Sequence, residues 1–379
     1  MIRDEQIIED LVRTVRRFVR ERLVPAEAEV EASNAVPPAI IQEMRELGLF
    51  GLSIPEEYGG LGLTMEEEVA LAFELGYTSA AFRSVIGTNN GIGSQGIIVD
   101  GTEAQKEYWL PRLASGEAIG SFALTEPDAG SDAGALKTTA VRDGDRYVLN
   151  GTKRYITNAP LADVFTLMAR TGGPGPGGIT AFLVPSDSPG LSLGAVDGKM
   201  GQRGTRTCDV ILDDCRVPAD AIIGGVEGRG FKTAMKVLNR GRLNISGVCV
   251  GAAERLCDEA VGFAKTRIQF GKPIAEHQLV QAMLADSFTE AFAGRCMVVE
   301  TAKRYDCGER IIKEAAASKL YCSEMVGRVA DRAVQVHGGA GYMQASPVEH
   351  FYRDVRLFRL YEGTSQIQQI IIGREMTAG

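Results

Sequence analysis

A single carboxylate near the C-terminus is the best candidate for a general base. Glu362 stands in the stretch 361–368, beside a glycine and several hydrogen-bonding side chains. Residues 357–361 are largely apolar, and partial burial raises the pKa of a carboxylate toward the range that suits a base near neutral pH. The alternative is that Glu362 accepts backbone N–H groups at a helix start capped by Thr364 or Ser365. Local sequence favours this second interpretation, so other segments must decide.

Two segments in the middle of the chain can contact a flat ring or a phosphate. Residues 122–132 join a strand to a turn, where backbone N–H groups and Thr125 or Ser131 can face a polar ring edge or a phosphate. Residues 154–158 place Tyr155 and Thr157 on one face of a strand, where the aromatic ring can cover a flat ligand. A plain turn and a half-buried tyrosine are the ordinary interpretations of these two patterns.

Three further segments carry polar residues in or after helices. Residues 266–273 and 334–342 both end a helix in glycine, and the second is neither a Rossmann nor a Walker motif. His337 has no nucleophile or carboxylate at a motif spacing, which favours a structural role. Arg240 and Arg242 lie in an otherwise apolar helix. One of them can bind an anion or a carbonyl, or form a buried salt bridge.

The periodicity of apolar residues divides the chain into three parts that must position these side chains. It predicts helices up to about residue 117, with starts at 36–38, Thr64 and Thr102. Alternation then predicts strands from about 119 to 226, including 164–169, 180–184 and 208–212, with hairpin turns at 142–145 and 150–151 and an exposed hairpin loop at 171–178. Long helices are predicted at 230–267, 277–306, 310–337 and 364–374.

Composition excludes several classes of protein. A net charge of -8 and a pI near 5.2, with interspersed charges, argue against a nucleic-acid partner. Seven irregularly spaced cysteines and three histidines indicate neither a disulfide framework nor a metal site, and predict a reducing compartment. We see no signal-peptide pattern and no apolar run that reaches about 18 residues. The sequence therefore predicts a cytoplasmic protein without a membrane span.

Taken together and in this order, these segments resemble the acyl-CoA dehydrogenase family over nearly the whole chain, in length, domain order and motif spacing. The resemblance implies an α+β multi-domain fold with an N-terminal α-helical domain (1–118), a middle β-barrel domain (119–227) and a C-terminal four-helix bundle (228–379). It also implies FAD between the second and third domains, partly covered by a partner subunit. The implied assembly is a homotetramer, built as a dimer of dimers.

The resemblance assigns a role to individual residues. Glu362 matches the catalytic base of the family. Some members carry the base one residue before the position of Arg242, where this chain has Gly241, which cannot ionise. The implied substrate contacts are Ser131, Arg242 and Gly363. The implied FAD contacts within one subunit are Phe122, Leu124, Thr125, Ser131, Tyr155 and Thr157. The implied contacts to FAD of the neighbouring subunit are Arg267, Phe270 and Gln278, with Gln335, Gly338 and Gly339 at its adenylate end, and the last FAD contacts are Thr364 and Gln366.

The implied reaction is α,β-dehydrogenation of an acyl-CoA to the trans-2-enoyl-CoA. Glu362 takes the α-proton, flavin N5 takes the β-hydride, and electrons pass to an electron-transferring flavoprotein. The backbone N–H of Glu362 and a ribityl hydroxyl of FAD stabilise the charge on the carbonyl. An oxygen-using acyl-CoA oxidase or flavin monooxygenase on the same fold, or a non-catalytic scaffold, stays open as an alternative. The acyl group is not fixed by the sequence, and residues 77–97 are expected to line part of its cavity.

Overall fold

The computed structural model describes residues 2–378 and begins with a helical part. Both predicted capping boxes are present, because Thr64 and Thr102 each accept a backbone N–H while Glu67 and Gln105 reach back to the cap. A π-helical turn, η4 (Asn89–Gly93), follows the fifth helix. The helices of this part are α1 (Glu5–Phe18), α2 (Val24–Ser33), α3 (Pro38–Glu46), α4 (Met65–Gly76), α5 (Ala80–Thr88), α6 (Gln95–Asp100) and α7 (Glu103–Ser115).

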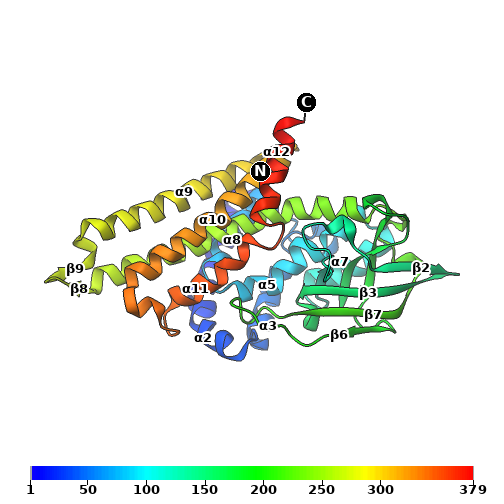
Figure 1. Ribbon diagram of the computed structural model, residues 1–379, viewed down its shortest axis with the longest axis horizontal. Helices are drawn as coiled ribbons and strands as arrows, with labels where there is room; N and C mark the ends of the chain where they lie inside the picture. The colour runs from blue at the N-terminus through cyan, green and yellow to red at the C-terminus, as the bar shows by residue number, and fades with distance from the viewer. Residues whose placement is uncertain (1, 379) are drawn as a thin grey trace.

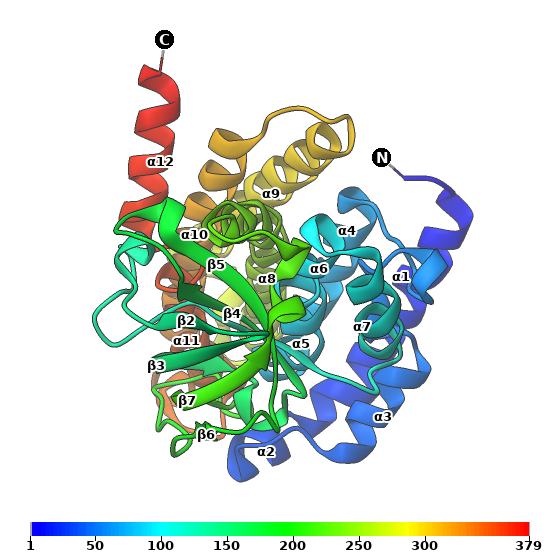
Figure 2. The same cartoon turned by 90° about the vertical axis from the view of Figure 1, so that its right-hand side faces the viewer.

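The middle of the chain is one curled seven-stranded sheet, which Figure 2 shows as a fan of strands beside the helices. The strand order is β1-β4-β2-β3-β7-β6, with β5 paired to β4. The predicted β domain thus takes the form of a curled sheet around its own apolar core. The strands are β1 (Gly120–Ala123), β2 (Thr139–Asp143), β3 (Arg146–Thr157), β4 (Val164–Arg170), β5 (Ile179–Pro185), β6 (Leu191–Leu193) and β7 (Thr207–Pro218).

One of the two predicted hairpin turns is confirmed and the other is wrong. Asp143 pairs with Arg146 across the turn between β2 and β3, as predicted. The Asn150–Gly151 pair does not form a turn, because β3 runs through it and pairs with β7 on both sides of a register shift. A Cβ on Gly151 would lie 2.5 Å from Thr138 Oγ1, so this glycine permits a close approach inside the sheet.

Three long helices dominate the C-terminal part and lie side by side in Figure 1. Two short strands, β8 (Ile268–Gln269) and β9 (Lys272–Pro273), connect the first two of them at the end of the molecule far from the sheet. The sequence patterns did not predict the short helix α11. The helices are α8 (Gly230–Thr266), α9 (Gln278–Asp306), α10 (Ile312–His337), α11 (Pro347–Val355) and α12 (Ser365–Thr377).

The two helical parts share one apolar core, which unites α4 with α8, α9 and α10. Glycines let α4 and α8 approach closely: a Cβ on Gly76 would lie 2.3 Å from Val248 O, and one on Gly251 would lie 2.0 Å from Phe73 O. The sheet packs beside this shared helical body. Within residues 2–378, no helix is both long and apolar enough to cross a membrane.

Candidate functional site

A cavity of about 1400 Å³ lies where the three parts of the chain meet. Its walls come from α5 and η4, from the sheet, from α8 and from the turn before α12. Several residues of 83–92 line the cavity, as the sequence predicts. The long loop between β4 and β5 also reaches the cavity. The predicted site residues in its wall are Phe122, Leu124, Thr125, Ser131, Tyr155, Thr157, Arg242, Glu362 and Gly363.

The turn that carries Glu362 has an unusual backbone. Glu362 and Gly363 both have positive φ angles, 54° and 89°, a left-handed conformation that a glutamate rarely adopts. Thr364 accepts the N–H of Ile367 and caps α12, whereas Glu362 Oε2 has no hydrogen-bond partner within residues 2–378. The structure therefore gives the helix cap to Thr364 and leaves the carboxylate of Glu362 facing the cavity. Strained backbone of this kind is found mostly at functional sites.

Glu362 lies directly against Gly241 of α8. A Cβ on Gly241 would lie 2.7 Å from Glu362 Oε2, so the absence of a side chain leaves room for the carboxylate. Burial raises the pKa of Glu362, and the nearby cations Arg83, Lys319 and Arg242 oppose this shift without cancelling it. A raised pKa makes this carboxylate a stronger proton acceptor than an exposed glutamate, which suits a general base.

Two side chains that the sequence analysis did not single out fix this turn. Lys319 Nζ, from α10, donates to Gly363 O at 2.7 Å. Gln368 Nε2, from α12, donates to Glu362 O at 3.1 Å and to Gly363 O at 2.9 Å. Lys319 is fully buried, and burial lowers its pKa. A lysine among the small apolar residues of one helix face was the sequence signal for it.

The segment after β1 is held by a buried ion pair. Lys153 Nζ, from β3, lies 2.7 Å from Glu126 Oε1 and also donates to Leu124 O at 3.2 Å. Glu126 further accepts the backbone N–H groups of Lys137 and Thr138, at 2.5 and 2.9 Å. Burial tends to raise the pKa of Glu126, but Lys153 and the hydrogen bonds outweigh burial and lower it. The pair therefore positions the loop that brings Thr125 and Ser131 to the cavity.

Tyr155 and Thr157 both line the cavity, as their spacing in one strand predicts. Tyr155 is 62% exposed and has a positive φ of 59°, next to a register shift between Lys153 and Ile156. The guanidinium of Arg154 lies 4.4 Å from the centre of its ring. The ring is thus presented on a bulged strand at the cavity instead of being packed into the sheet.

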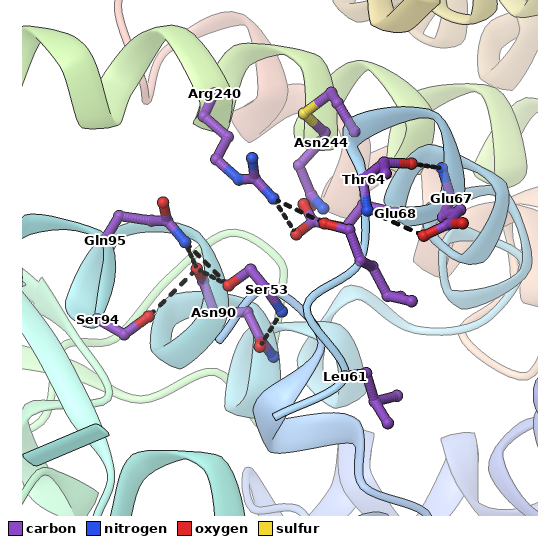
Figure 3. A network of polar contacts seen from close by, with 12 residues as sticks. Ser53, Leu61, Thr64, Glu67, Glu68, Asn90, Ser94, Gln95, Arg240 and Asn244 are labelled. Atoms are coloured by element: carbon purple, nitrogen blue, oxygen red, sulfur yellow. Dashed lines mark hydrogen bonds and ion pairs between the residues drawn. The ribbon is translucent and has the colours of Figure 1, made fainter. Parts of the chain in front are cut away.

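The wall formed by η4 rests on a network of buried polar groups (Figure 3). Ser53 Oγ donates to Asn90 O at 2.8 Å, and Gln95 Nε2 donates to Ser53 Oγ at 2.9 Å. Figure 3 also shows Arg240 of α8 bound to Glu68, which is the buried salt bridge that the sequence allowed for one of the two arginines. Arg242 forms no such pair within residues 2–378, and it faces the cavity.

Eight predicted FAD contacts lie outside the cavity that the described residues form. Thr364 and Gln366 follow the lining residue Gly363 in the chain. The other six are exposed, and Phe270 at the β8–β9 turn is 94% exposed with a positive φ of 53°. The structure does not test their assignment to a neighbouring subunit, which stays a prediction. These six are Arg267, Phe270, Gln278, Gln335, Gly338 and Gly339.

Comparison with known families and proteins gives consistent matches over the whole chain. The family models described as the N-terminal, middle and C-terminal domains of acyl-CoA dehydrogenase match residues 5–117, 121–215 and 228–377. An acyl-CoA dehydrogenase of Bacillus subtilis (strain 168) is 39% identical, covering 100% of this chain and 99% of the relative.

Two further proteins show how the relatives differ. The caffeyl-CoA reductase-Etf complex subunit CarC of Acetobacterium woodii is 40% identical over 96% of this chain and 96% of the relative. A solved structure of a glutaryl-CoA dehydrogenase from Mycobacterium smegmatis, in complex with FADH2, has a TM-score of 0.93 and 32% identity, covering 99% of this chain and 96% of that chain.

Proposed function

Because the chain belongs to the acyl-CoA dehydrogenase family, we propose that it converts an acyl-CoA to the trans-2-enoyl-CoA, with Glu362 as the base that takes the α-proton. Members of the family are FAD-dependent oxidoreductases, and so is this protein. The proposal rests on the carboxylate of Glu362, which faces a large cavity with one oxygen unpaired and with a pKa that burial raises.

The cavity suits FAD together with an acyl thioester. Its volume of about 1400 Å³ exceeds the roughly 300–1,000 Å³ that holds one small ligand. An exposed tyrosine ring beside threonine hydroxyls matches a flat ring with polar edges. When bound, FAD supplies the acceptor for the hydride that leaves the β-carbon. We assign its contacts in this subunit to Phe122, Leu124, Thr125, Ser131, Tyr155 and Thr157.

Removal of the α-proton requires a base and a stabilised carbonyl oxygen. The α-C–H of a thioester is a far weaker acid than a glutamic acid, so the charge that forms on the carbonyl must be stabilised as the proton leaves. The raised pKa makes Glu362 a stronger base than an exposed glutamate. We assign the donor to the backbone N–H of Glu362, in the left-handed turn that Lys319 and Gln368 hold.

Two parts of the proposal concern partners. The likeness to a subunit of an Etf complex supports an electron-transferring flavoprotein as the redox partner. The exposed β8–β9 turn with Phe270 supports the expected homotetramer, in which this turn would reach FAD of a neighbouring subunit. An exposed phenyl ring is stabilised when a partner covers it.

The reverse reaction is a second candidate, because one relative is named as a subunit of a caffeyl-CoA reductase-Etf complex. The same residues serve both directions: protonated Glu362 would return a proton to the α-carbon of an enoyl-CoA. Rates measured with an acyl-CoA plus an electron acceptor, and with an enoyl-CoA plus reduced dye, decide which direction the enzyme favours. Peroxide formed in air, without reduction of an electron-transferring flavoprotein, would instead support the oxidase alternative.

The test of the base is the substitution Glu362→Gln in the FAD-loaded protein. We expect the variant to keep its flavin and to bind acyl-CoA, but to reduce the flavin about 10³- to 10⁴-fold more slowly, because the amide cannot take a proton. Anaerobic stopped-flow mixing follows the bleaching of the yellow flavin. The matched control is Glu375→Gln on α12, outside the cavity, which should bleach at the wild-type rate. Rapid bleaching of the Glu362 variant would place the base elsewhere.

A further inference from the structure

Residues 199–205, which precede β7 and which we call the cavity loop, are held in the cavity wall by a buried aspartate. Lys199, Gln202 and Thr205 of this loop line the cavity. Gln202 is buried, and its positive φ of 51° is a conformation that a glutamine rarely adopts. Asp354 of α11 accepts the backbone N–H of Gln202 at Oδ1, and Gln202 Nε2 donates to Asp354 O at 3.2 Å. Asp354 therefore holds the strained part of the loop.

The cavity loop also contacts the residue that precedes the proposed base. Gln202 and Tyr361 both line the cavity. Burial raises the pKa of Tyr361, and a hydrogen bond from the Gln202 side chain opposes that shift. Glu362 follows Tyr361 directly in the chain. A displacement of the cavity loop would therefore reach the carboxylate of Glu362 through one side chain and one peptide bond.

His350 is the only ion-pair partner of Asp354 within residues 2–378. Its Nε2 lies 3.1 Å from Asp354 Oδ2 and 3.3 Å from Oε2 of Glu31, on α2, which lies beside α11 in Figure 1. All the same, Nε2 has no aligned hydrogen bond within these residues, so the contact depends on the charge of the ring. Asp354 is 3% exposed. A neutral imidazole would leave its carboxylate buried without a cation, next to a second carboxylate.

The other charged groups near His350 have partners of their own. Arg255 Nη2 lies 3.5 Å from Glu27 Oε2, and Arg353 Nη2 donates to Glu31 Oε1 at 2.9 Å. Burial tends to lower the pKa of His350, but the nearby carboxylates outweigh burial and raise it. The charged groups on the elements around His350 are Glu27, Glu31, Lys199, Arg203, Arg255, Glu349, Arg353 and Asp354.

We propose that Asp354 and His350 are positioning residues for the dehydrogenation, and that they hold the cavity loop and Tyr361 in place only while His350 is protonated. The inference rests on the proposed function and adds a second titrating group to it. Glu362 must be deprotonated to act, so kcat/KM rises as pH passes through the pKa of Glu362. His350 must be protonated, so kcat/KM falls as pH rises through the pKa of His350, above the ordinary histidine value of about 6.5.

The test is the pH dependence of kcat/KM for the FAD-loaded enzyme, with the acyl-CoA that the wild type oxidises fastest in a series from butyryl-CoA to palmitoyl-CoA. His350→Gln should lose the alkaline limb and stay roughly 3- to 10-fold below the wild-type maximum, mainly through a higher KM. His350→Lys keeps a cation, so it should recover most of the activity and move the alkaline limb to higher pH. The acid limb should stay in place. The control is Lys106→Gln on α7, which removes an exposed pair with Glu103 and should leave both limbs unchanged.

A second measurement requires no turnover. Because the folded pKa of His350 is raised, its contribution to stability is complete below the ordinary histidine pKa and is lost as pH rises through the folded value. The difference in Tm between the wild type and His350→Gln should therefore shrink from about pH 6 to about pH 9. A difference that does not change over this range would contradict the bridge between His350 and the two carboxylates.

The outcomes separate this inference from the proposed function. If His350→Gln keeps the alkaline limb, or if His350→Lys does not move it, the positioning role is wrong while the dehydrogenase activity stands. A pH-dependent Tm difference combined with an unchanged limb would leave His350 a purely structural role and would also overturn the inference. If no acyl-CoA bleaches the flavin of the wild type, the proposed function fails, and the positioning role fails with it. Should His350→Gln not fold, the shift of the limb in His350→Lys alone decides the question.

Discussion

Two glutamates with buried carboxylate oxygens, Glu126 and Glu362, have opposite surroundings. Glu126 is fully satisfied: one oxygen binds Lys153 and a backbone N–H, and the other binds a second backbone N–H. Glu362 has cations nearby, but one of its oxygens is unpaired. The pKa of Glu126 is lowered because its partners outweigh burial, whereas the pKa of Glu362 is raised because burial prevails.

The contrast shows how one residue type serves two purposes in one protein, because Glu126 holds a loop that reaches the cavity and Glu362 lines the cavity itself. A carboxylate with all its hydrogen bonds made is held in one place and in one charge state, which suits it to position a loop. A buried carboxylate with an oxygen that lacks a hydrogen-bond partner lowers the stability of the protein, but it can accept a proton from a substrate. The substitutions below test whether the two glutamates differ in this way.

The largest effect is expected from Lys153→Met, which leaves Glu126 buried without its cation. We expect the free energy of unfolding to fall by about 3–5 kcal/mol, measured by urea denaturation. The double variant Lys153→Met with Glu126→Gln should recover part of the loss. Lys137→Met, which removes only an exposed pair with Asp128, should change the free energy by less than about 1 kcal/mol. Equal losses in the two single variants would contradict a special role for the buried pair.

An intermediate effect is expected from Gly241→Ala. The new Cβ would lie 2.7 Å from Glu362 Oε2 and must displace the carboxylate. We expect kcat to fall roughly 10- to 100-fold, because a shift of about 1 Å misplaces the base. Folding should not suffer, since alanine favours a helix over glycine by about 1 kcal/mol. The control is Gly262→Ala on the same helix, where the Cβ meets nothing within 4 Å, and it should keep full activity.

The smallest effect is a gain in stability from Glu362→Gln, opposite in sign to Glu126→Gln. We expect the free energy of unfolding to rise by about 1 kcal/mol at neutral pH, which is typical when a destabilising active-site residue is replaced. Because its folded pKa is raised, wild-type Glu362 destabilises the protein as pH rises from the ordinary glutamate pKa through the folded value. Thermal melts across this range should therefore show the gain shrinking toward acid pH. Glu126 works in the other direction, and its contribution is lost as pH falls through its lowered pKa.

Local sequence patterns predicted the structural features that are determined by residues close together in the chain. The capping residues Thr64 and Thr102, the boundaries of the long helices and the position of Glu362 before a helix capped by Thr364 all follow from short stretches. The Asn150–Gly151 turn failed because a glycine in a strand can also serve close packing against Thr138, and the dipeptide alone does not distinguish these uses.

Contacts between distant residues were beyond these patterns. Gly241 and Glu362 are 121 positions apart in the chain, and the Arg83–Asn244 contact spans 161 positions. For Arg240 and Arg242 the sequence allowed an anion site or a salt bridge, and only the fold shows which arginine meets Glu68. Burial and charge compensation are properties of the assembled core, and for that reason Lys153 and Lys319 entered the site only with the structure.

The proposed base of this protein lies on the turn before α12, and Gln368 Nε2 of that helix donates to the carbonyl oxygens of both Glu362 and Gly363. The position of the carboxylate of Glu362 therefore depends on how firmly α12 is packed against the rest of the protein. A protein cleaved within α12 by a protease would keep its shared helical core and its sheet, yet it would be inactive. Fraying at this end of the chain would act on turnover before it acted on folding.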